Sequence, residues 1–482
     1  MNDTTYNIYK KMPVWIQNMA CSIAGYAQYR RRYNSKFSKY LEDLKESEWW
    51  DIEEIKGYQN KKISEIVTYA YKKVPFYRRV MDRRGISPKD IDKREDLKQL
   101  PIIDKNTIKK YKNQFKSDEF NDGSLIKRKT SGTTGNPLEL YMTKDAVTRQ
   151  RAVWWRHKNR FGIRPWDKRL SFGARVLVPE SQSRPPYWRY NWAKNQYYLS
   201  IYHIKDKNIK SIAKWLNEES FDFFEGYPSA IYNLACQIES QNLKIKNRPK
   251  YIFTGADALI PEFKQKIENV FGVKATEHYG MAEACGNISK CEKGSFHVDH
   301  EFGVLETVSD KKGAKNEKRM IFTGFHNKAM PLIRYDIGDY CTMSNSNCSC
   351  GRSSKILKSI DGRIEDFVRT KDGGRAVGMN RVFKWAEGVQ EIQIVQKSLN
   401  KLVVRIKPDN DFDFSYTKEK LSTELKKRIG EEIEIEFDIV EEIPRSKSGK
   451  YRAVVSEIES QLSGERALKN KVDADIGNIR SN

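Results

Sequence analysis

The segment from residue 219 to 285 alternates between strand-like and helix-like patterns, and this alternation restricts the fold more than any other feature. "SFDFFEGYPSAIYNLACQIES" reads as strand, turn and helix, and "PKYIFTGADALIPEFKQKIENVFG" repeats that order before "KATEHYGMAEA" starts another strand and turn. Strands that alternate with helices predict an α/β fold with buried parallel strands. Ligands of such folds bind beyond the carboxyl ends of the strands. The loops "GYPSA", "GADAL" and "YGMAE" are therefore expected at one crevice.

The flanking regions differ in character from this segment. Residues 1–120 look mainly helical, and "KISEIVTYAYKKVPFYRRVMDRRG" carries apolar residues at helical spacing and ends on Gly85. "KRMIFTGFHNKAMPLIRYDIGDYCTM" predicts a β-hairpin. Beyond "SIDGRIEDFV", short alternating strands and one charged helix predict a small α+β domain of roughly a hundred residues, followed by a frayed polar tail. The predicted class is α/β, with a large first domain and a small second one.

Composition and charge restrict the function. The 482 residues suffice for two or three domains, and 88 Lys and Arg against 64 Asp and Glu give a formal charge of +24. Such an excess suits nucleic acid, an anionic membrane surface or an anionic substrate. Because the charges are spread along the chain, we interpret most of them as solvated surface. The aromatic residues of 150–200 either stack bases or fill a core or pocket; we favour the second, so no nucleic-acid partner is predicted.

The N-terminal region and the cysteines indicate where in the cell the protein is expected. "MPVWIQNMACSIAGYA" has the flanking charges of a secretory signal, but Pro13, Gln17 and Asn18 interrupt its apolar core, so we expect a helix docked on the surface. No run of about 18 apolar residues is present, and no stable membrane insertion is predicted. The seven cysteines favour reduced thiols or metal ligands over a disulfide framework in so large a chain. We predict a cytoplasmic protein, either a monomer or a homodimer.

Small residues are crowded in "KRKTSGTTGNPLEL", at residues 127–140. Successive backbone N–H groups in a Gly-rich turn form a concave anion site, and hydroxyl groups add donors. No Lys follows the second glycine, so the loop is not of the "GxxxxGK[ST]" kind. On its own, the stretch fits a plain hairpin loop as well as a phosphate cradle. The residues that would supply the donors are Thr130, Ser131, Gly132, Thr133, Thr134 and Gly135.

Three further motifs carry charged groups. Glu283 of "YGMAE" is a hard oxygen ligand that suits Mg²⁺, or only a charge near a helix N-terminus. Asp339 of "RYDIGDY" can accept both hydroxyls of a ribose, or simply cap an acidic turn. Lys450 of "PRSKSGKYR" can neutralise charge that builds up in a transition state, or be one lysine of an exposed basic loop.

In their order along the chain, these motifs resemble those of the adenylate-forming superfamily of acyl- and aryl-CoA ligases, over roughly residues 90–455. The likeness is to the phenylacetate–CoA ligase-like group, including CapK-type enzymes of capsule-polysaccharide clusters. "TSGTTGNPL" resembles the family's phosphate loop, "GADAL" its adenine-contacting turn and "YGMAE" its Mg-binding motif. "RYDIGD" resembles the ribose motif, "DGRIED" the interdomain hinge and "PRSKSGKYR" the segment with the adenylation lysine.

The resemblance implies a domain organisation. A large N-terminal adenylate-forming domain would have mainly parallel sheets with flanking helices, and a small mobile α+β domain would follow it. We expect a helical segment at 1–90, the large ATP- and acyl-binding domain at 91–360, a hinge at 361–366, the small C-terminal domain at 367–460 and a flexible tail at 461–482.

It also implies an activity, in which an ATP-dependent carboxylate ligase forms an acyl-AMP and then an acyl thioester with CoA. Lys450, Glu283 and Thr133 would be catalytic, with Glu283 holding Mg²⁺. In the family the small domain rotates between the two half-reactions, about a pivot that would comprise Gly362, Arg363 and Glu365. The pocket for the small carboxylic acid would be lined by Tyr227, Ala256, His278 and Tyr279. ATP would be bound by Thr130, Ser131, Gly132, Thr133, Thr134, Gly135, Gly255, Ala256, Asp257, Tyr279, Gly280, Asp339 and Arg363.

Three positions depart from the family pattern. Ala282 stands where the family usually has Thr or Ser, which removes a hydroxyl contact to phosphate worth about 1 kcal/mol. Leu138 stands where many relatives have Lys, and Glu365 replaces the more usual Asp of the hinge. None of these changes removes a central group, but Ala282 bears on rate or on the choice of acceptor.

A second constellation has the composition of a zinc site. "CEKGSFHVDH" supplies a Cys and a His at C-x5-H spacing, and "NCSCGRS" supplies two Cys at C-x-C spacing. Three sulfurs and one nitrogen suit tetrahedral Zn²⁺ in a structural role, because four protein ligands leave no open position. The "CxCGR" element also resembles zinc-carrying members of the phenylacetate ligase-like group. The predicted ligands are Cys291, His297, Cys348 and Cys350, with His300, Cys285 and Cys341 as alternates.

The acid and the final acceptor stay open at this point. The aromatic residues suit an aryl or small hydrophobic acid, and a capsule context admits an amino or hydroxy acid. Besides CoA, the acceptor is either the phosphopantetheine of a carrier protein or a sugar amine. Two other functions compete with the ligase: a nucleic-acid-binding protein that uses the basic surface, and a noncatalytic scaffold, for which Ala282 is the only support.

Overall fold

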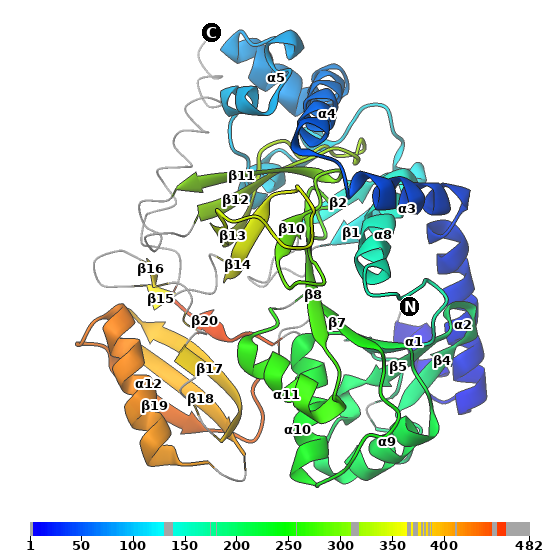
Figure 1. The fold of residues 1–482 in the computed structure, drawn as a ribbon, viewed down its shortest axis with the longest axis vertical. Coiled ribbons are helices and arrows are strands. Elements are labelled where there is room, and N and C mark those ends of the chain that lie inside the picture. The colour runs from blue at the N-terminus through cyan, green and yellow to red at the C-terminus, as the bar shows by residue number, and fades with distance from the viewer. Residues whose placement is uncertain are drawn as a thin grey trace.

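A computed structural model describes the chain at residues 3–129, 138–173, 175–179, 181–256, 258–309, 318–363, 368–369, 375–376, 379, 382–383, 386, 388–409, 412–445 and 451–458. Within these residues, one mixed sheet of twelve strands forms the centre of the molecule, in the order β11-β12-β13-β14-β10-β9-β8-β7-β6-β3-β5-β4 (Figure 1). The predicted α/β class is confirmed.

The parallel half of this sheet is the segment of alternating strands and helices. Its parallel strands are β3 (Arg169–Gly173), β5 (Gln196–Ser200), β6 (Phe223–Gly226), β7 (Tyr251–Gly255) and β8 (Ala275–Gly280), and β4 (Trp188–Asn191) closes the edge antiparallel to β5. Consecutive residues of β3 are buried because helices cover both faces of the strand.

Alternate side chains of the parallel strands enter two different cores. Phe224 and Ile252 pack under α9 (Asp206–Glu218), α10 (Pro228–Ser240) and α11 (Pro261–Phe271). Phe223 and Phe253 point to the opposite face and pack with α3 (Ser35–Ser47) and α8 (Lys144–Asn159). This period of two sends alternate side chains of each strand to the two buried faces of the sheet.

The other half of the sheet is antiparallel. Its strands are β9 (Asn287–Lys290), β10 (Phe296–Val298), β11 (Gly303–Ser309), β12 (Lys318–Gly324), β13 (Tyr335–Met343) and β14 (Ile356–Arg363). Strands β12 and β13 pair antiparallel, which confirms the predicted hairpin. A separate pair, β1 (Ile126–Lys129) and β2 (Glu139–Met142), flanks the predicted phosphate loop.

The N-terminal region is helical, as predicted, but the long helix that ends on Gly85 is two helices. The elements are α1 (Asp3–Tyr9), α2 (Val14–Arg32), α3, α4 (Ile52–Lys73), α5 (Pro75–Arg84), α6 (Lys105–Lys110) and α7 (Lys112–Phe115). Val74 has extended φ and ψ of −124° and 109° between α4 and α5. Gly85 caps α5 in the left-handed region, at φ 63°.

Helix α2 docks along the edge strand of the sheet, as expected for this segment. Arg189 Nε of β4 donates to Gln17 Oε1 at 2.6 Å, and the backbone N–H of Trp192 donates to Ser22 Oγ at 3.2 Å. None of the helices formed by the described residues is both long and apolar enough to cross a membrane.

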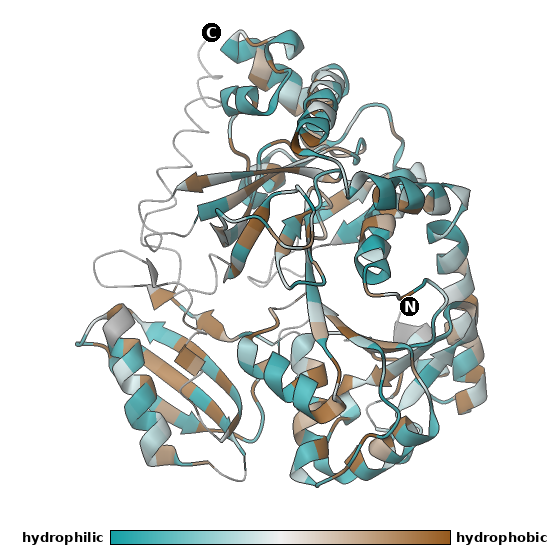
Figure 2. Ribbon diagram, viewed as in Figure 1, coloured by the Kyte–Doolittle hydropathy of each residue, from teal (hydrophilic) through white to brown (hydrophobic). Residues whose placement is uncertain are grey.

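The C-terminal unit is a four-stranded sheet with one helix. It contains β17 (Val389–Ser398), β18 (Lys401–Pro408), α12 (Phe414–Ile429), β19 (Glu434–Ile439) and β20 (Val454–Ser456), and the pair β15 (Val368–Arg369) and β16 (Arg375–Ala376) precedes it. Buried and partly exposed residues alternate along β18, and much of this sheet is coloured as hydrophobic (Figure 2). The unit lies beside α10 and α11 (Figure 1), where Tyr451 packs 5.9 Å from the Phe263 ring.

Candidate active site and metal centre

The carboxyl ends of β3, β6, β7 and β8 meet at one edge, because the parallel registers align Gly226 with Phe172 and Thr254 and align Gly255 with His278. The loops predicted to bind ligands begin at these ends. Gly226 has a φ of 158°, and a Cβ atom there would lie 2.2 Å from the Phe172 carbonyl oxygen. Only glycine allows this close approach of the two strand ends.

The turn after β7 is held in an uncommon conformation. Ala256 has a φ of 71°, in the left-handed region that favours glycine. Such backbone strain persists where the surrounding structure fixes the turn, and it concentrates at ligand sites. A Cβ atom on the preceding Gly255 would lie 2.9 Å from His278 Cε1, so the turn also packs closely on β8.

Two predicted ATP-binding residues from distant parts of the chain are in direct contact. The Tyr279 hydroxyl, at the end of β8, donates a hydrogen bond to the Asp339 carboxylate on β13. Asp339 is buried, and it is the register partner of Arg363 on β14. The structure therefore brings Tyr279, Asp339 and the backbone of Arg363 to one place; the side chain of Arg363 lies outside the described residues.

Glu283 lies in the turn between β8 and β9 rather than at the start of a helix. Its side chain is buried and accepts a hydrogen bond from the Tyr335 hydroxyl, at 3.3 Å. The neighbouring Ala284 has a φ of 52°. Gln150 of α8 fixes the same turn, because its Nε2 donates to the Met281 carbonyl at 2.9 Å. Tyr335 and Gln150 were missed by the motif analysis, although Tyr335 belongs to the quoted "RYDIGDY".

The predicted acyl-lining residues lie at the same strand ends. His278 is in ring contact with Trp154 of α8, with ring centres 5.4 Å apart. Burial, followed by the positive charge of Lys158, lowers the pKa of His278 to about 4, so its imidazole is neutral at pH 7. Tyr227 begins α10 and packs against the core beneath that helix.

Several predicted residues lie outside the described residues. They belong to the phosphate loop, the adenine turn, the hinge and the basic C-terminal loop. Nothing in the structure therefore bears on these assignments, which stay predictions: Thr130, Ser131, Gly132, Thr133, Thr134, Gly135, Asp257, Glu365 and Lys450.

The four predicted zinc ligands form one group. Their ligand atoms all lie within 4.8 Å of one another. Cys291 Sγ is 3.6 Å from Cys348 Sγ, and Cys350 Sγ is 3.4 Å from His297 Nε2. The antiparallel pairing of β9, β10 and β14 brings together two pairs that lie about fifty residues apart in the sequence.

The surroundings of this group hold its side chains in position. His297 Nδ1 lies 3.1 Å from Ser354 Oγ, which leaves Nε2 directed to the sulfurs. Burial and nearby arginines lower the pKa of His297 to about 4, so the ring is in the neutral form that binds metals. The two cysteines named as alternative zinc ligands lie elsewhere: Cys285 contacts Met281, and Cys341 is buried on β13.

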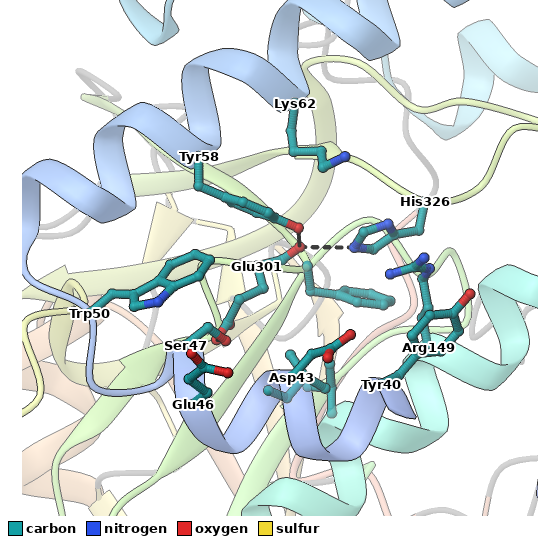
Figure 3. Close-up of a pocket in the computed structure, with 13 residues that line it drawn as sticks. Tyr40, Asp43, Glu46, Ser47, Trp50, Tyr58, Lys62, Arg149, Glu301 and His326 are labelled. Carbon is teal, nitrogen blue, oxygen red and sulfur yellow. Dashed lines mark hydrogen bonds between the residues drawn. The ribbon is translucent and has the colours of Figure 1, made fainter. Parts of the chain in front are cut away.

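A cavity of about 370 Å³ lies apart from all of these residues, between α3, α4 and α8 (Figure 3). Tyr40 and Asp43 reach it from α3, and Tyr58 from α4. His326 Nε2 donates to the Glu301 carbonyl oxygen at 2.8 Å. None of the described residues predicted for ATP, acid or metal lines this cavity.

Comparisons with known proteins show which proteins this chain is similar to. Residues 368–457 match the family model described as the CapK C-terminal domain. Protein CapK of Staphylococcus aureus is 30% identical over 455 residues, which cover 94% of this chain and 99% of that protein. Phenylacetate-coenzyme A ligase of Thermus thermophilus is 23% identical over 452 residues, which cover 84% of this chain and 96% of that protein.

A solved structure has the same fold. The 2-hydroxyisobutyryl-CoA ligase, in a postadenylation state with an acyl-AMP compound, superposes with a TM-score of 0.65 at 18% identity. The superposition covers 88% of this chain and 94% of that one. The shared architecture therefore extends through both the large and the small part of the chain.

Proposed function

Because the chain belongs to the CapK family of adenylate-forming enzymes, we propose that it activates a small carboxylic acid with ATP, forming an acyl-AMP and then an acyl thioester with CoA. Phenylacetate-coenzyme A ligases of several bacteria are similar to most of the chain. The reaction joins a carboxylate to the α-phosphate of ATP and releases pyrophosphate. A thiol then displaces AMP from the acyl-adenylate.

The observation that carries this proposal is the contact between Tyr279 and Asp339. These residues come from β8 and β13, yet they meet where the parallel strands end. A buried carboxylate held by a tyrosine hydroxyl is pre-oriented to accept the two hydroxyls of a ribose. Glu283 follows Tyr279 by four residues and adds a second buried carboxylate at the same edge.

The reaction requires that two anions approach each other, so the site must offset their repulsion. Glu283 fits a magnesium ligand, because its carboxylate is an acceptor-only oxygen group that Tyr335 holds in place at 3.3 Å. Magnesium, when bound, screens the phosphate charges. The donors of residues 130–135 would hold the phosphates, and Lys450 would hold the carboxylate and the α-phosphate oxygens.

The test is a panel of carboxylic acids scored by ATP–pyrophosphate exchange. We expect exchange that depends on one class of acid, and release of AMP when CoA is added. If exchange occurs but CoA does not discharge the adenylate, the acceptor is a carrier-protein phosphopantetheine or a sugar amine. Absence of acid-dependent exchange with every acid of a broad panel would contradict the proposed adenylation.

We further propose that Cys291, His297, Cys348 and Cys350 bind one structural Zn²⁺. Three sulfurs and one imidazole nitrogen within 4.8 Å of one another are the donor set and the spacing of a tetrahedral zinc site. Four protein ligands leave no position for substrate. The ion would therefore tie the segment around Cys348 to the β9–β10 turn instead of taking part in the reaction.

Metal analysis of the purified protein tests the zinc proposal. We expect about one equivalent of zinc per chain, because the site is complete within one chain. Cys348→Ser should lose most of the metal and lower the melting temperature. Cys341→Ser is the matched control, since Cys341 is a buried cysteine outside the group, and it should keep the metal. Much less than one equivalent in the unaltered protein contradicts the proposal.

A further inference from the structure

Five cationic residues from five separate segments of the chain act on one another electrostatically, and two of them, Arg128 and Arg151, are joined by contacts to the predicted site. We call them the cationic cluster. Arg32 ends α2, Arg128 lies on β1, Arg151 lies on α8, Arg175 follows β3, and Lys194 lies in the turn between β4 and β5. Lys194 is only 5% exposed. Arg128 belongs to the quoted "KRKTSGTTGNPLEL", but nothing in the local sequence distinguishes any of the five from surface charges.

One contact path joins the cluster to β8. The Arg151 guanidinium lies 4.2 Å from the centre of the Trp154 ring, and that ring contacts His278 at the end of the strand. His278 is one of the predicted acyl-lining residues. The positive charge of Arg151 is thus one aromatic ring away from the predicted acid site.

A second path joins the cluster to the turn that carries Glu283. Arg128 Nη1 donates to Gln150 Oε1 at 2.7 Å, and Gln150 Nε2 donates to the Met281 carbonyl at 2.9 Å. On the far side of the cluster, the Lys194 ammonium donates to Gln28 Oε1 of α2. That bond uses one of the three ammonium hydrogens.

The members of the cluster are close enough to affect one another's pKa. Burial, together with Arg151, Arg128 and Arg175, lowers the pKa of Arg32 to about 9. Burial and neighbouring arginines, Arg32 first among them, lower the pKa of Lys194 to about 7. Both shifts have the sign expected of like charges that share a poorly solvated site.

Some buried arginines elsewhere in the described residues have carboxylate partners, whereas the buried Arg189 donates to amide and carbonyl oxygens. Arg156 pairs with Asp299 and Glu301, and Arg352 pairs with Glu48 and Glu292. In contrast, the ion pairs formed among the described residues include no member of the cationic cluster. The Nε atoms of Arg32 and Arg151 are buried without a hydrogen-bond partner in that part of the chain.

One described carboxylate, that of Glu225, acts electrostatically on the cluster. Glu225 affects the pKa of Arg151, but its oxygens already pair with Lys158 at 2.5 Å and with Arg169 at 3.2 Å. These three residues form a set at the end of β6, and Arg169 of this set also acts on Arg151 and Lys194, so the set adjoins the cluster.

Within the cluster, Lys194 is buried, Arg32, Arg128 and Arg151 are partly exposed, and Arg175 is exposed. A cation held away from water is stabilised by a counter-charge, so the cluster suits an anion from outside the chain.

We propose that the cationic cluster binds a second anionic group, a phosphate, sulfate or carboxylate, on the acid that the enzyme activates. This inference rests on the proposed function. The planar fork of donors on each arginine matches the oxygens of such groups. The substrate would therefore carry two anionic groups, with one carboxylate at the reacting end and the other anionic group among the arginines; we call an acid with two such groups doubly charged.

The order of the strands favours the acid over the nucleotide as the source of this anion. The Tyr279–Asp339 contact joins β8 to β13, on the antiparallel side of the sheet. Arg175 and Lys194 lie next to β3, β4 and β5, on the opposite side of β8. The competing source is the phosphate chain of ATP, because Arg128 lies two residues before the predicted phosphate loop.

Matched pairs of acids test the proposal in the full chain. Butyrate is compared with succinate, and glycerate with 3-phosphoglycerate, by ATP–pyrophosphate exchange. We expect kcat/KM to be at least about tenfold higher for the doubly charged member of a pair, the gain that one charge-assisted hydrogen bond supplies. Equal or better use of the singly charged acids in both pairs overturns the proposal.

Variants separate the two sources of the anion. Arg151→Gln and Lys194→Met should each raise the KM of the doubly charged acid about tenfold to a hundredfold and leave the KM of ATP within about twofold. Arg151→Lys should restore part of the loss, because it keeps the charge without the planar fork. A rise in the KM of ATP alone would assign the cluster to the triphosphate. Lys39→Gln, at an exposed position of α3, is the control.

A binding measurement keeps this inference distinct from the proposed activity. Succinate and butyrate, and 3-phosphoglycerate and glycerate, are titrated calorimetrically into protein saturated with a non-hydrolysable ATP analogue, which occupies the nucleotide site. We expect tighter binding of the doubly charged partner and loss of that preference in Arg151→Gln. If the protein prefers to bind the acid with two anionic groups but shows no ATP–pyrophosphate exchange, the adenylation proposal alone is wrong. If it shows exchange but no such binding preference, the cluster proposal alone is wrong.

Discussion

Lys194 is the member of the cationic cluster whose charge can change near neutral pH. Burial and the positive charges of Arg32, Arg169, Arg175 and Arg151 lower its pKa to about 7. Guanidinium groups stay protonated throughout this range. Loss of the Lys194 proton therefore removes one positive charge from the cluster while the arginines keep theirs.

We predict that the affinity for a dicarboxylate falls as pH rises. The anion favours the protonated lysine, so binding is strongest below the pKa of about 7 and weakens above it. The measurement is the KM of succinate between pH 6.5 and 8, where succinate is mostly the dianion and the pH stays below the pKa of Arg32, which is about 9. Lys194→Arg should flatten the profile and keep the low KM, whereas Lys194→Met should flatten it at a high KM. An unchanged profile in both variants would show that another group titrates.

Lys450 is predicted to act in one half-reaction only. Lys450→Ala should lower the rate of adenylate formation by at least about a hundredfold, because it removes a cation that offsets developing charge in the transition state. Transfer from a supplied acyl-adenylate to CoA should stay within about threefold of the unaltered rate. Lys426→Ala, on α12 of the same unit, is the control. Equal loss in both half-reactions contradicts the assigned role.

Individual residues differ in how far the sequence can place them. The four cysteine and histidine ligands were predictable, because their pairs have metal-binding spacing and donor type. Glu283 and Asp339 were predictable as candidates from their motifs, but their partners Tyr335 and Tyr279 depended on the pairing of distant strands. The cationic cluster could not be predicted from the sequence, because its members are single residues from distant segments and share no motif or regular spacing.

Helix α8 connects two polar regions through its opposite faces. One face carries Gln150, Arg151 and Trp154 toward the strand ends, and another buries Arg156. Arg156 donates to Asp299 at 2.6 Å and to both oxygens of Glu301, and so anchors the helix to the loop between β10 and β11. The position of the acyl side of the site thus depends on a buried ion network on the far side of the same helix.

We predict that Glu301→Gln lowers the free energy of unfolding by about 3 kcal/mol, because it leaves the buried Arg156 without one of its counter-charges. Urea unfolding measures the change. Burial by itself would raise the pKa of Glu301, but Arg156 holds it far below the usual range. The ion pair therefore contributes fully above about pH 4.3, the unfolded value, and its contribution is lost as pH falls further. The difference between the two proteins should shrink in the same direction.

An exposed glutamate is the control for this substitution. Glu53 lies on α4 and pairs with Lys56 at 2.7 Å on the surface, so Glu53→Gln should change the unfolding curve little at any pH. A similar effect of the two substitutions, or a difference that grows on acidification, would contradict the role given to the buried network.

The break between α4 and α5 shows why the boundaries of elements were less predictable than their type. The apolar spacing continues through the break, so periodicity alone predicted one helix up to Gly85. Pro75 lacks an N–H group and disfavours helical backbone at Val74, which has extended angles. Pro75 could have indicated the break between α4 and α5, but the apolar residues keep helical spacing on both sides of it, so the pattern gave no sign that the helix ends there.

Some strands of the large sheet were predictable from the sequence, but their order in the sheet was not. Alternation of strands and helices indicated the parallel strands β6, β7 and β8 and the edge at which their loops meet. The neighbours of these strands were not predictable, because β3 pairs with β6 and β10 pairs with β14 across long stretches of chain. The family resemblance identified the site motifs from their order along the chain. Only the folded sheet shows that residues of β8 and β13 are in contact.

Tyr451 joins the two parts of the chain next to Lys450. Its hydroxyl donates to the Ile392 carbonyl on β17, and its ring packs 5.9 Å from Phe263 on α11. A second contact lies close by, where the Tyr232 hydroxyl donates to the Val389 carbonyl at 3.4 Å. The relation between the small unit and the large domain therefore depends on the residue that follows the predicted adenylation lysine.

We predict that Tyr451→Ala slows adenylate formation by roughly threefold to tenfold, the value of one lost aromatic contact, because the arrangement that presents Lys450 becomes less populated. Thioester formation from a supplied acyl-adenylate should change less, since the family's second half-reaction uses another orientation of the small domain. Phe414→Ala is the matched control, because the ring contacts of Phe414 among the described residues are with Phe412 and Phe437 of the same unit. If both variants slow adenylation equally, the loss reflects the stability of the small unit and not its position against α11.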